Sequence, residues 1–259
     1  MNISAERMCM PTIPEDLFME SLATLIRMDN GWIPNGELSS LYIRPVLFAL
    51  DEGIGIRPSK TYRFMIFSSP VNAYYSKPVK IKIERHFTRA AKGGTGFAKA
   101  AGNYGNSLYP AYVAAQYGVD QCLWTDAKEH KYIEECGTMN IFFVINNTLI
   151  TPALSDSILD GITRRSIVQM AHDWNIPVEE RKVSVEEVIN AIKNNTLQEA
   201  FGCGTAATIA HIAQLVDEDI TYELPPIAGR AISSRIEKHF LELKKLRVED
   251  KHNWMYVLS

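Results

Sequence analysis

Residues 89–110 read RAAKGGTGFAKAAGNYGNSLYP, and this stretch decides the assignment of the fold. Glycines and alanines surround Lys99 and Tyr104, so the backbone can approach a flat ligand while few side chains compete for the space. Gly94 and Gly96 form neither a GKS/T phosphate loop nor a GxGxxG turn that opens a helix, so no nucleotide motif is present. A lone lysine is usually solvated, and composition alone therefore does not make Lys99 functional.

The sequence before this stretch predicts a small domain and a linker. Residues 40–50 and 61–71 are rich in β-forming residues and are separated by the turn-forming DEGIGIRPSK, which predicts two paired strands. Two prolines, two serines and an asparagine in SPVNAYYSKP, residues 69–78, indicate a linker. VKIKIER, from residue 79, alternates apolar and charged side chains, so a half-buried strand opens a second domain there.

The sequence after it alternates strands and helices. A helix is predicted over 107–118, ended by Gly118, and a hairpin is predicted to turn at Asn146 and Asn147. Another helix begins near Gly161, the next carries a capping box at Ser184 and Glu187, and a long one covers 228–245. We expect a small domain at 1–70, a linker at 71–78 and a large domain at 79–259.

Composition and charge exclude several classes of function. The 27 basic and 30 acidic side chains are mixed along the chain and give a net charge of −3, so no basic stripe is available for nucleic acid. No apolar run is long enough to span a bilayer, and the first residues lack a signal-peptide core, so we expect a cytoplasmic protein. The four cysteines form no CxxC pair and the six histidines no metal-binding spacing, so we expect no disulfide framework and no metal.

Several motifs together resemble a known family. KAAGNYGNSLYPAYVAAQYG, EECGTMNIFFV, LDGITRRSI and FGCGTAAT occur in the order and at spacings similar to those of the branched-chain amino-acid aminotransferases, which are fold-type IV pyridoxal-phosphate enzymes. SLYIRP upstream and WMYVLS at the end extend the resemblance over nearly the whole chain. It implies an α+β, two-domain fold with a small α/β domain and a large pseudo-barrel domain. It also implies that the chain begins just after a phosphate-binding arginine, with the small domain truncated.

The resemblance assigns the chemistry of the cofactor, pyridoxal 5′-phosphate. Lys99 would carry it as a Schiff base, and Tyr104 would hydrogen-bond its phenolic oxygen. Glu135 would face the pyridine nitrogen and keep the ring protonated, so that the ring acts as an electron sink. The adjacent acid, Glu134, is expected to face away and to be solvated, because neighbouring residues of a strand point to opposite faces.

The resemblance also assigns the remaining contacts. Backbone amides at a helix start suit a phosphate dianion, and the resemblance places Arg89 on the phosphate side as well. The other residues implied around the cofactor, besides those above, are Gly137, Thr138, Ile162, Thr163 and Thr205. Those implied around the substrate are Tyr42, Arg44, Val71, Thr138, Thr205 and Ala206. Tyr42 and Arg44 alternate along a predicted strand and so share one face. Val71 would close over the branched side chain, from the partner subunit of a homodimer.

The implied function is reversible transfer of the amino group of leucine, isoleucine or valine to 2-oxoglutarate, with amino acids and 2-oxo acids as the only partners besides a second copy of the chain. Two alternatives stay open. One is another fold-type IV enzyme, a D-amino-acid aminotransferase or an aminodeoxychorismate lyase, against which SLYIRP, GTMN and the KGGTG approach to the lysine argue. The other is a non-catalytic, truncated remnant.

Overall fold

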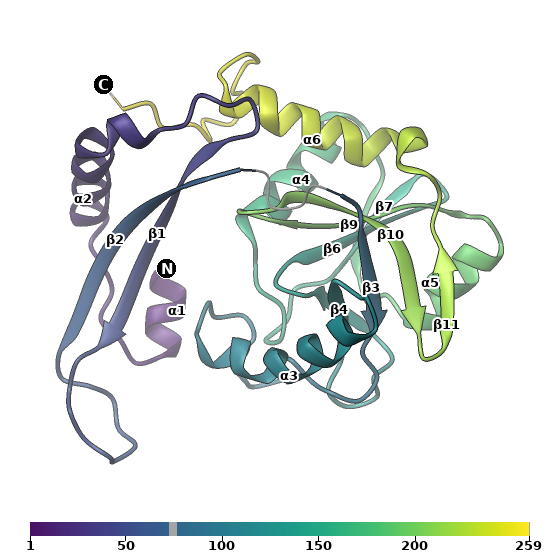
Figure 1. Cartoon of the computed structure of the whole chain (residues 1–259), viewed down its shortest axis with the longest axis horizontal. Helices are drawn as coiled ribbons and strands as arrows, with labels where there is room; N and C mark the ends of the chain where they lie inside the picture. The colour runs from purple at the N-terminus through teal and green to yellow at the C-terminus, as the bar shows by residue number, and fades with distance from the viewer. Residues whose placement is uncertain (73–76, 259) are drawn as a thin grey trace. The chain divides into compact units, whose positions relative to one another are not determined.

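The structure is a computed structural model that describes residues 1–72 and 77–258. The chain folds into two compact units, unit 1, Met1–Tyr74 with Asn253–Ser259, and unit 2, Tyr75–His252 (Figure 1). The sequence instead assigned the C-terminal residues to the large domain. The predicted linker, 71–78, includes residues 73–76, which lie outside the described residues, so the domain boundaries stay a prediction.

Unit 1 is built on one antiparallel strand pair. Its elements are α1 (Asn2–Arg7), α2 (Glu15–Met28), the short 3-10 helix η1 (Asn30–Trp32), β1 (Ser40–Ala49) and β2 (Tyr62–Val71). The pairing of β1 with β2 is the one that the two apolar runs predicted. The turn between them is closed by Asp51, whose carboxylate accepts the backbone N–H groups of Lys60 and Thr61 at 2.8 and 2.9 Å.

Strand β2 ends at the residue that the sequence predicted, and it overlaps the predicted linker by one residue. Val71, predicted as the first linker residue, is the last residue of β2 and is paired with Ser40. Pro70 lies within the strand, opposite Leu41. Proline is tolerated there because the sheet of unit 1 has only two strands in the described chain, and an edge strand can leave a backbone position without an N–H donor. The predicted strand and the predicted linker therefore share Val71, which the structure places in the strand.

Unit 2 is organised around a large mixed sheet. In the described residues it has nine strands in the order β5-β4-β3-β10-β9-β6-β7-β8, with β11 paired to β10. The strands are β3 (Val79–Ile83), β4 (Gln121–Thr125), β5 (Ile133–Cys136), β6 (Asn140–Ile145), β7 (Thr148–Pro152), β8 (Val178–Arg181), β9 (Leu197–Gly204), β10 (Thr208–Asp217) and β11 (Ile220–Glu223). The hairpin between β6 and β7 turns at Asn146 and Asn147, both with positive φ, as predicted.

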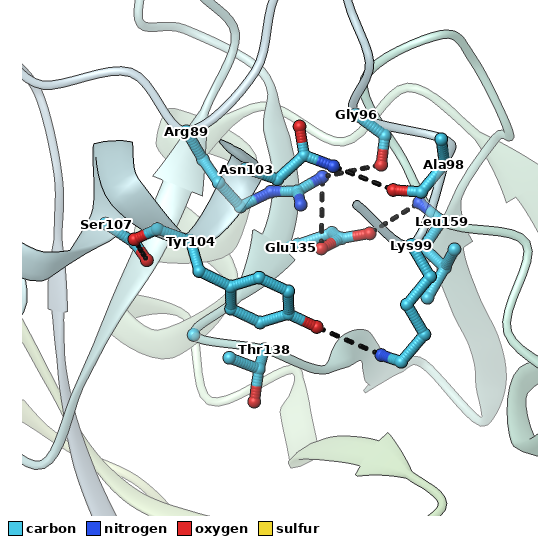
Figure 2. A pocket seen from close by; sticks show the side chains of 11 residues that line it. Arg89, Gly96, Ala98, Lys99, Asn103, Tyr104, Ser107, Glu135, Thr138 and Leu159 are labelled. Carbon is cyan, nitrogen blue, oxygen red and sulfur yellow. Dashed lines mark hydrogen bonds and ion pairs between the residues drawn. The ribbon is translucent and has the colours of Figure 1, made fainter. Parts of the chain in front are cut away.

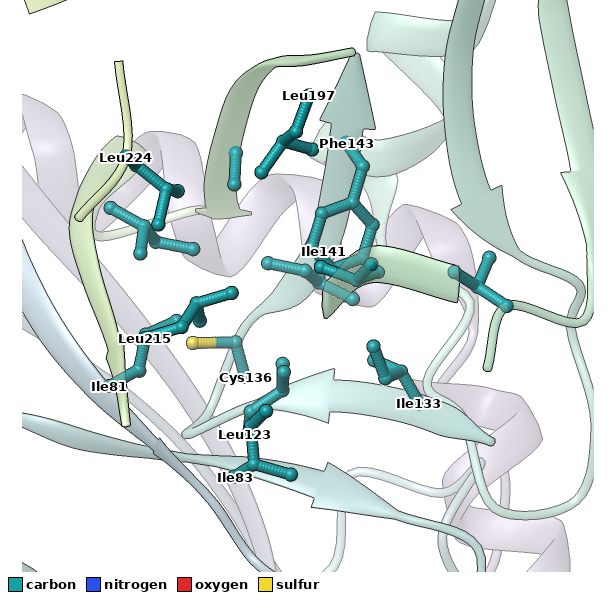
Figure 3. Close-up of a cluster of buried hydrophobic side chains, with 14 of the residues drawn as sticks. Ile81, Ile83, Leu123, Ile133, Cys136, Ile141, Phe143, Leu197, Leu215 and Leu224 are labelled. Atoms are coloured by element: carbon teal, nitrogen blue, oxygen red, sulfur yellow. The ribbon is translucent and has the colours of Figure 1, made fainter. Parts of the chain in front are cut away.

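The sheet is covered on both faces along β6, which is why this strand is almost entirely apolar. Along β6, Ile141 and Phe143 point into one core cluster, with residues of β3, β4 and β10 (Figure 3). The intervening Phe142 and Val144 belong to a second cluster, which contains residues of α4 and α6. Alternate side chains thus enter opposite cores, and every residue of β6 is buried.

The helices of unit 2 largely follow the sequence signals. They are α3 (Gly102–Gln116), α4 (Ile162–Asp173), α5 (Val185–Lys193) and α6 (Ala231–Lys244), with the 3-10 turn η2 (Ile227–Gly229) before α6. Ser184 caps α5 by accepting the N–H of Glu187 at 3.0 Å, as predicted. Helix α3 begins five residues before the predicted start at Ser107, because glycines with low helix propensity hide its first turn. In the described part of the chain, no helix has the length and apolarity of a membrane span.

Candidate active site

The glycine-rich stretch of the sequence lines a pocket in unit 2 (Figure 2). Three segments form its wall, namely the loop that leads into α3 with the first turns of that helix, the end of β5 with its following turn, and the loop before α4. The lining residues are Arg89, Gly96, Ala98, Lys99, Asn103, Tyr104, Ser107, Glu135, Gly137, Thr138 and Leu159. Six of the residues that the resemblance assigned to the cofactor therefore lie together: Arg89, Lys99, Tyr104, Glu135, Gly137 and Thr138.

Lys99 and Tyr104 form a polar pair at the pocket. The Nζ atom of Lys99 donates a hydrogen bond of 3.1 Å to the Oη atom of Tyr104 (Figure 2). Lys99 comes from the loop just before α3, and Tyr104 from the first turn of that helix. Both side chains are exposed in unit 2. An amine and a phenol are thus presented at the pocket side by side.

Asn103 fixes the loop that carries Lys99, and the sequence reasoning missed it. Its Nδ2 donates to the carbonyl oxygens of Thr95 and Ala98, at 2.8 and 2.7 Å. Its Oδ1 accepts the hydroxyl of Thr95 at 2.7 Å. This buried amide therefore binds both sides of the turn that precedes Lys99. An asparagine among small residues next to the lysine was the available signal.

Glu135 is the buried carboxylate of the pocket. Its side chain lies 3.2 Å from Nη2 of Arg89, and its other oxygen accepts the N–H of Leu159 at 2.6 Å (Figure 2). Burial raises the pKa of Glu135 to about 7, while Arg89, the Leu159 amide and Lys99 lower it and Glu134 raises it. Near neutral pH, this carboxyl group is consequently able to hold or release a proton.

The pKa of Glu135 predicts a pH dependence of stability in the cofactor-free protein. The pKa is about 7 in the folded chain against an ordinary 4.5, so the folded state binds more protons than the unfolded state between these values. The free energy of unfolding should therefore fall as pH rises through this window, by up to about 3 kcal/mol. Urea denaturation over the window measures it. Glu135→Gln should remove this part of the slope, and an unchanged slope would contradict the assignment.

The structure contradicts the expectation that Glu134 is solvated. The side chain is half-buried and accepts a hydrogen bond from the hydroxyl of Ser157. Burial raises its pKa. Two residues of the same loop bind the two acids, Ser157 binding Glu134 and Leu159 binding Glu135. The loop before α4 therefore covers both acids.

The N-cap of α4 lies two residues after the pocket residue Leu159. Gly161 is the N-cap, and no side-chain hydrogen bond caps the helix. A Cβ on Gly161 would lie 2.2 Å from Oδ1 of Asn140, so this close approach requires glycine. Asn140 also donates to the carbonyl oxygen of Leu159 at 2.8 Å. The first amides of α4 are thereby held close to the pocket wall.

Other predicted residues lie outside the pocket lining. Ile162 and Thr163 are the first residues of α4, and Thr205 and Ala206 lie in the exposed turn between β9 and β10. In unit 1, Tyr42 and Arg44 share one face of β1, since the guanidinium carbon of Arg44 lies 5.0 Å from the ring centroid of Tyr42. Val71 ends β2 of the same unit. Their assignment to cofactor or substrate stays a prediction.

Gly96 is expected to tolerate no side chain. A Cβ added there would lie 2.6 Å from both Cα of Ser157 and Cβ of Ala90, so backbone would have to move. We expect Gly96→Ala to lower the free energy of unfolding by about 1–3 kcal/mol, as overpacking does. Gly105→Ala is the control, because nothing lies within 4 Å of a Cβ at this position of α3. It should be neutral or stabilising. Equal effects in thermal denaturation would contradict the close approach.

The family follows from a comparison with known proteins. The family model described as amino-transferase class IV matches residues 1–215. This chain belongs to the class IV aminotransferases. The predicted membership and the predicted kind of enzyme are therefore confirmed.

Two relatives and one solved structure are named as branched-chain amino-acid aminotransferases. Branched-chain-amino-acid aminotransferase 2 of Bacillus subtilis is 45% identical over 257 residues, which are 98% of this chain and 71% of that protein. A probable branched-chain-amino-acid aminotransferase of Staphylococcus epidermidis is 44% identical, over 98% of this chain and 72% of its own length. The solved structure of the Escherichia coli branched-chain amino acid aminotransferase has a TM-score of 0.77 at 28% identity, covering 99% of this chain and 80% of that one. The predicted fold is confirmed.

Proposed function

We propose that this class IV aminotransferase transfers the amino group of leucine, isoleucine or valine reversibly to 2-oxoglutarate, with pyridoxal phosphate bound through Lys99. The relatives above, at 44 and 45% identity, bear the name of this activity. The observation that carries the proposal is the pairing of the Lys99 amine with the Tyr104 phenol beside the buried Glu135 carboxylate. No feature of the described residues favours a D-amino-acid aminotransferase or a lyase.

The donor set of the pocket fits pyridoxal phosphate. Lys99 is an amine that can attach to an aldehyde, and the Tyr104 hydroxyl can pair with a phenolic oxygen. Glu135 offers a carboxylate, whose negative charge is opposite to that of a protonated ring nitrogen. The uncapped first turn of α4 offers amides to a phosphate. These four groups are complementary to the aldehyde, the phenolic oxygen, the ring nitrogen and the phosphate of the cofactor.

The residues divide the work of the reaction. When bound, the cofactor supplies an aldehyde for amines and a ring that takes up the electron pair left when a Cα–H bond breaks. The Nζ atom of Lys99 takes the proton from the substrate Cα, which contributes roughly 10²–10⁴-fold to the rate. Tyr104 orients that nitrogen through its hydroxyl. Glu135 holds a proton at the ring nitrogen, and the loop fixed by Asn103 keeps Lys99 in place.

The remaining contacts complete the proposal. Thr163 and Ile162 would receive the phosphate with the first amides of α4, and Thr205 and Ala206 would hold the substrate carboxylate. Tyr42, Arg44 and Val71 would line the side-chain pocket, with Val71 contributed by the partner subunit. We propose accordingly that the protein is a homodimer, and that it is cytoplasmic. Sedimentation analysis of the purified protein tests the dimer.

The function is tested by spectrum and turnover together. Purified protein with pyridoxal phosphate should show a visible absorbance band that disappears on borohydride reduction. L-leucine, L-isoleucine and L-valine should each yield the corresponding 2-oxo acid, and 2-oxoglutarate should yield glutamate. D-alanine is the control for the D-amino-acid alternative. Turnover of D-alanine alone, or cofactor binding without any turnover, would contradict the proposal.

A further inference from the structure

Arg89 lies against Glu135. It follows β3 in the chain, and its side chain is about 10% exposed. Its Nη2 atom lies 3.2 Å from a carboxylate oxygen of Glu135 (Figure 2). The same nitrogen donates to the carbonyl oxygens of Gly96, at 3.4 Å, and of Ser157. The guanidinium is therefore engaged by one carboxylate and two main-chain groups of the pocket wall.

These contacts give Glu135 its principal counter-charge. The carboxylate is 3% exposed, and a buried charge without a partner is costly. The charged groups that face it are Arg89, the adjacent Glu134 and Lys99, and Arg89 is the largest of the influences that favour the ionised form. The Leu159 amide supports the other oxygen. Without Arg89, the ammonium group of Lys99 would be the positive charge left to compensate the carboxylates of Glu135 and Glu134.

We propose that Arg89 is a positioning residue, which acts on the cofactor through Glu135 by favouring the ionised form of that carboxylate and by holding it at the pocket wall. The inference rests on the proposed function for its consequence, since an ionised Glu135 is what can hold a proton on the cofactor ring nitrogen. It replaces the role that the resemblance implied for Arg89, which was contact with the phosphate. In this proposal the guanidinium of Arg89 affects the ring nitrogen of pyridoxal phosphate, through Glu135.

The two roles of Arg89 differ in which part of the ligand they affect. A phosphate ligand would matter for pyridoxal phosphate and not for pyridoxal, which lacks the phosphate. A partner of Glu135 would matter for both, because both carry the ring nitrogen. It would also matter in the protein without cofactor, because the ionisation of Glu135 depends on the guanidinium beside it. The ionisation of Glu135 can be measured without any assay of enzymatic activity.

The experiment titrates the Glu135 carboxyl group by ¹³C NMR in cofactor-free protein. We expect Arg89→Met to raise its titration midpoint clearly, Arg89→Lys to raise it less because a cation remains, and Arg164→Met to leave it unchanged. Arg164 is a matched control, since it is also buried and pairs with a carboxylate, Glu180, and with a main-chain carbonyl. Equal midpoints in wild type and Arg89→Met would overturn the inference.

Ligand binding gives the second readout. Arg89→Met should weaken pyridoxal phosphate and pyridoxal by the same factor, roughly 10- to 150-fold, as loss of a charged hydrogen-bond partner does. In a Glu135→Gln background, the same substitution should have little further effect. Weaker binding of pyridoxal phosphate alone would assign Arg89 to the phosphate and overturn the inference.

The failure of the inference and that of the proposed function are distinguishable. If the wild-type protein binds neither pyridoxal nor its phosphate, the proposed function is wrong, while the titration of Glu135 still decides whether Arg89 controls that carboxylate. If Arg89→Met does not fold, Arg89→Lys carries the test. A Lys variant with the wild-type midpoint and a reduced affinity for pyridoxal phosphate alone would then overturn the inference.

Discussion

Lys99→Ala is expected to abolish transamination and the covalent attachment of pyridoxal phosphate. The substitution removes the only amine that lines the pocket in the described residues, and this amine is also the proposed proton acceptor. Binding of the cofactor by the remaining groups should persist in weakened form, because Tyr104, Glu135 and the start of α4 are untouched. Borohydride reduction followed by peptide mapping measures attachment, and 2-oxo acid production measures turnover.

Lys92→Ala is the matched control for Lys99→Ala. Lys92 is seven residues earlier in the same glycine-rich stretch, is exposed and does not line the pocket. The Lys92→Ala variant should attach the cofactor and turn over leucine as the wild-type protein does. A pyridoxyl group found on Lys92, or on any other lysine, would show that the site has been assigned to the wrong residue.

Glu135→Gln is expected to lower kcat on the order of 10²–10³-fold, the usual cost of removing a charge that stabilises the transition state. Gln has nearly the same shape and can still accept the N–H of Leu159, but it carries no charge to hold a proton on a ring nitrogen. The fold should therefore survive better than the rate. Steady-state kinetics with L-leucine, alongside circular dichroism, separates the two effects.

The neighbouring acid supplies the control for Glu135→Gln. Glu134 accepts a hydrogen bond from Ser157, and the carbonyl oxygen of a Gln can accept it equally well. We expect Glu134→Gln to turn over at close to the wild-type rate. Similar losses in the two variants would mean that both acids serve the pocket through a shared charge, and that the separate role of Glu135 is wrong.

The parts of the fold that the sequence predicted are those set by local chemistry. Asn146 and Asn147 adopt the positive φ that asparagine tolerates in a two-residue hairpin, and Ser184 bonds the amide three residues later. Gly161 marked the start of α4 for a similar reason. Each signal is complete within a few residues, so the sequence carries it without knowledge of the tertiary structure.

The parts that the sequence did not predict depend on long-range packing. Arg89 and Glu135 are 46 positions apart, and neither residue's own surroundings in the sequence indicate the other. Glu134 was expected in solvent, because alternation says which way a side chain points and not which loop covers it. Asn103 was overlooked because its acceptors are main-chain carbonyls. Every residue has such a carbonyl, so the sequence does not show which of them the side chain binds.

The backbone of Leu159 is held at both its N–H and its carbonyl oxygen, and this limits the ligands that the pocket can bind. Its N–H is bound to Glu135 and its carbonyl oxygen to Asn140, and Gly161, two residues on, is the N-cap of α4. The proposed anchor for the ring nitrogen and the proposed anchor for the phosphate are thus joined by a few consecutive residues, whose covalent geometry sets the greatest distance between them. The hydrogen bonds at Leu159 hold this short segment in place. A ligand whose two polar ends are separated differently cannot satisfy both anchors at once, whatever its charge.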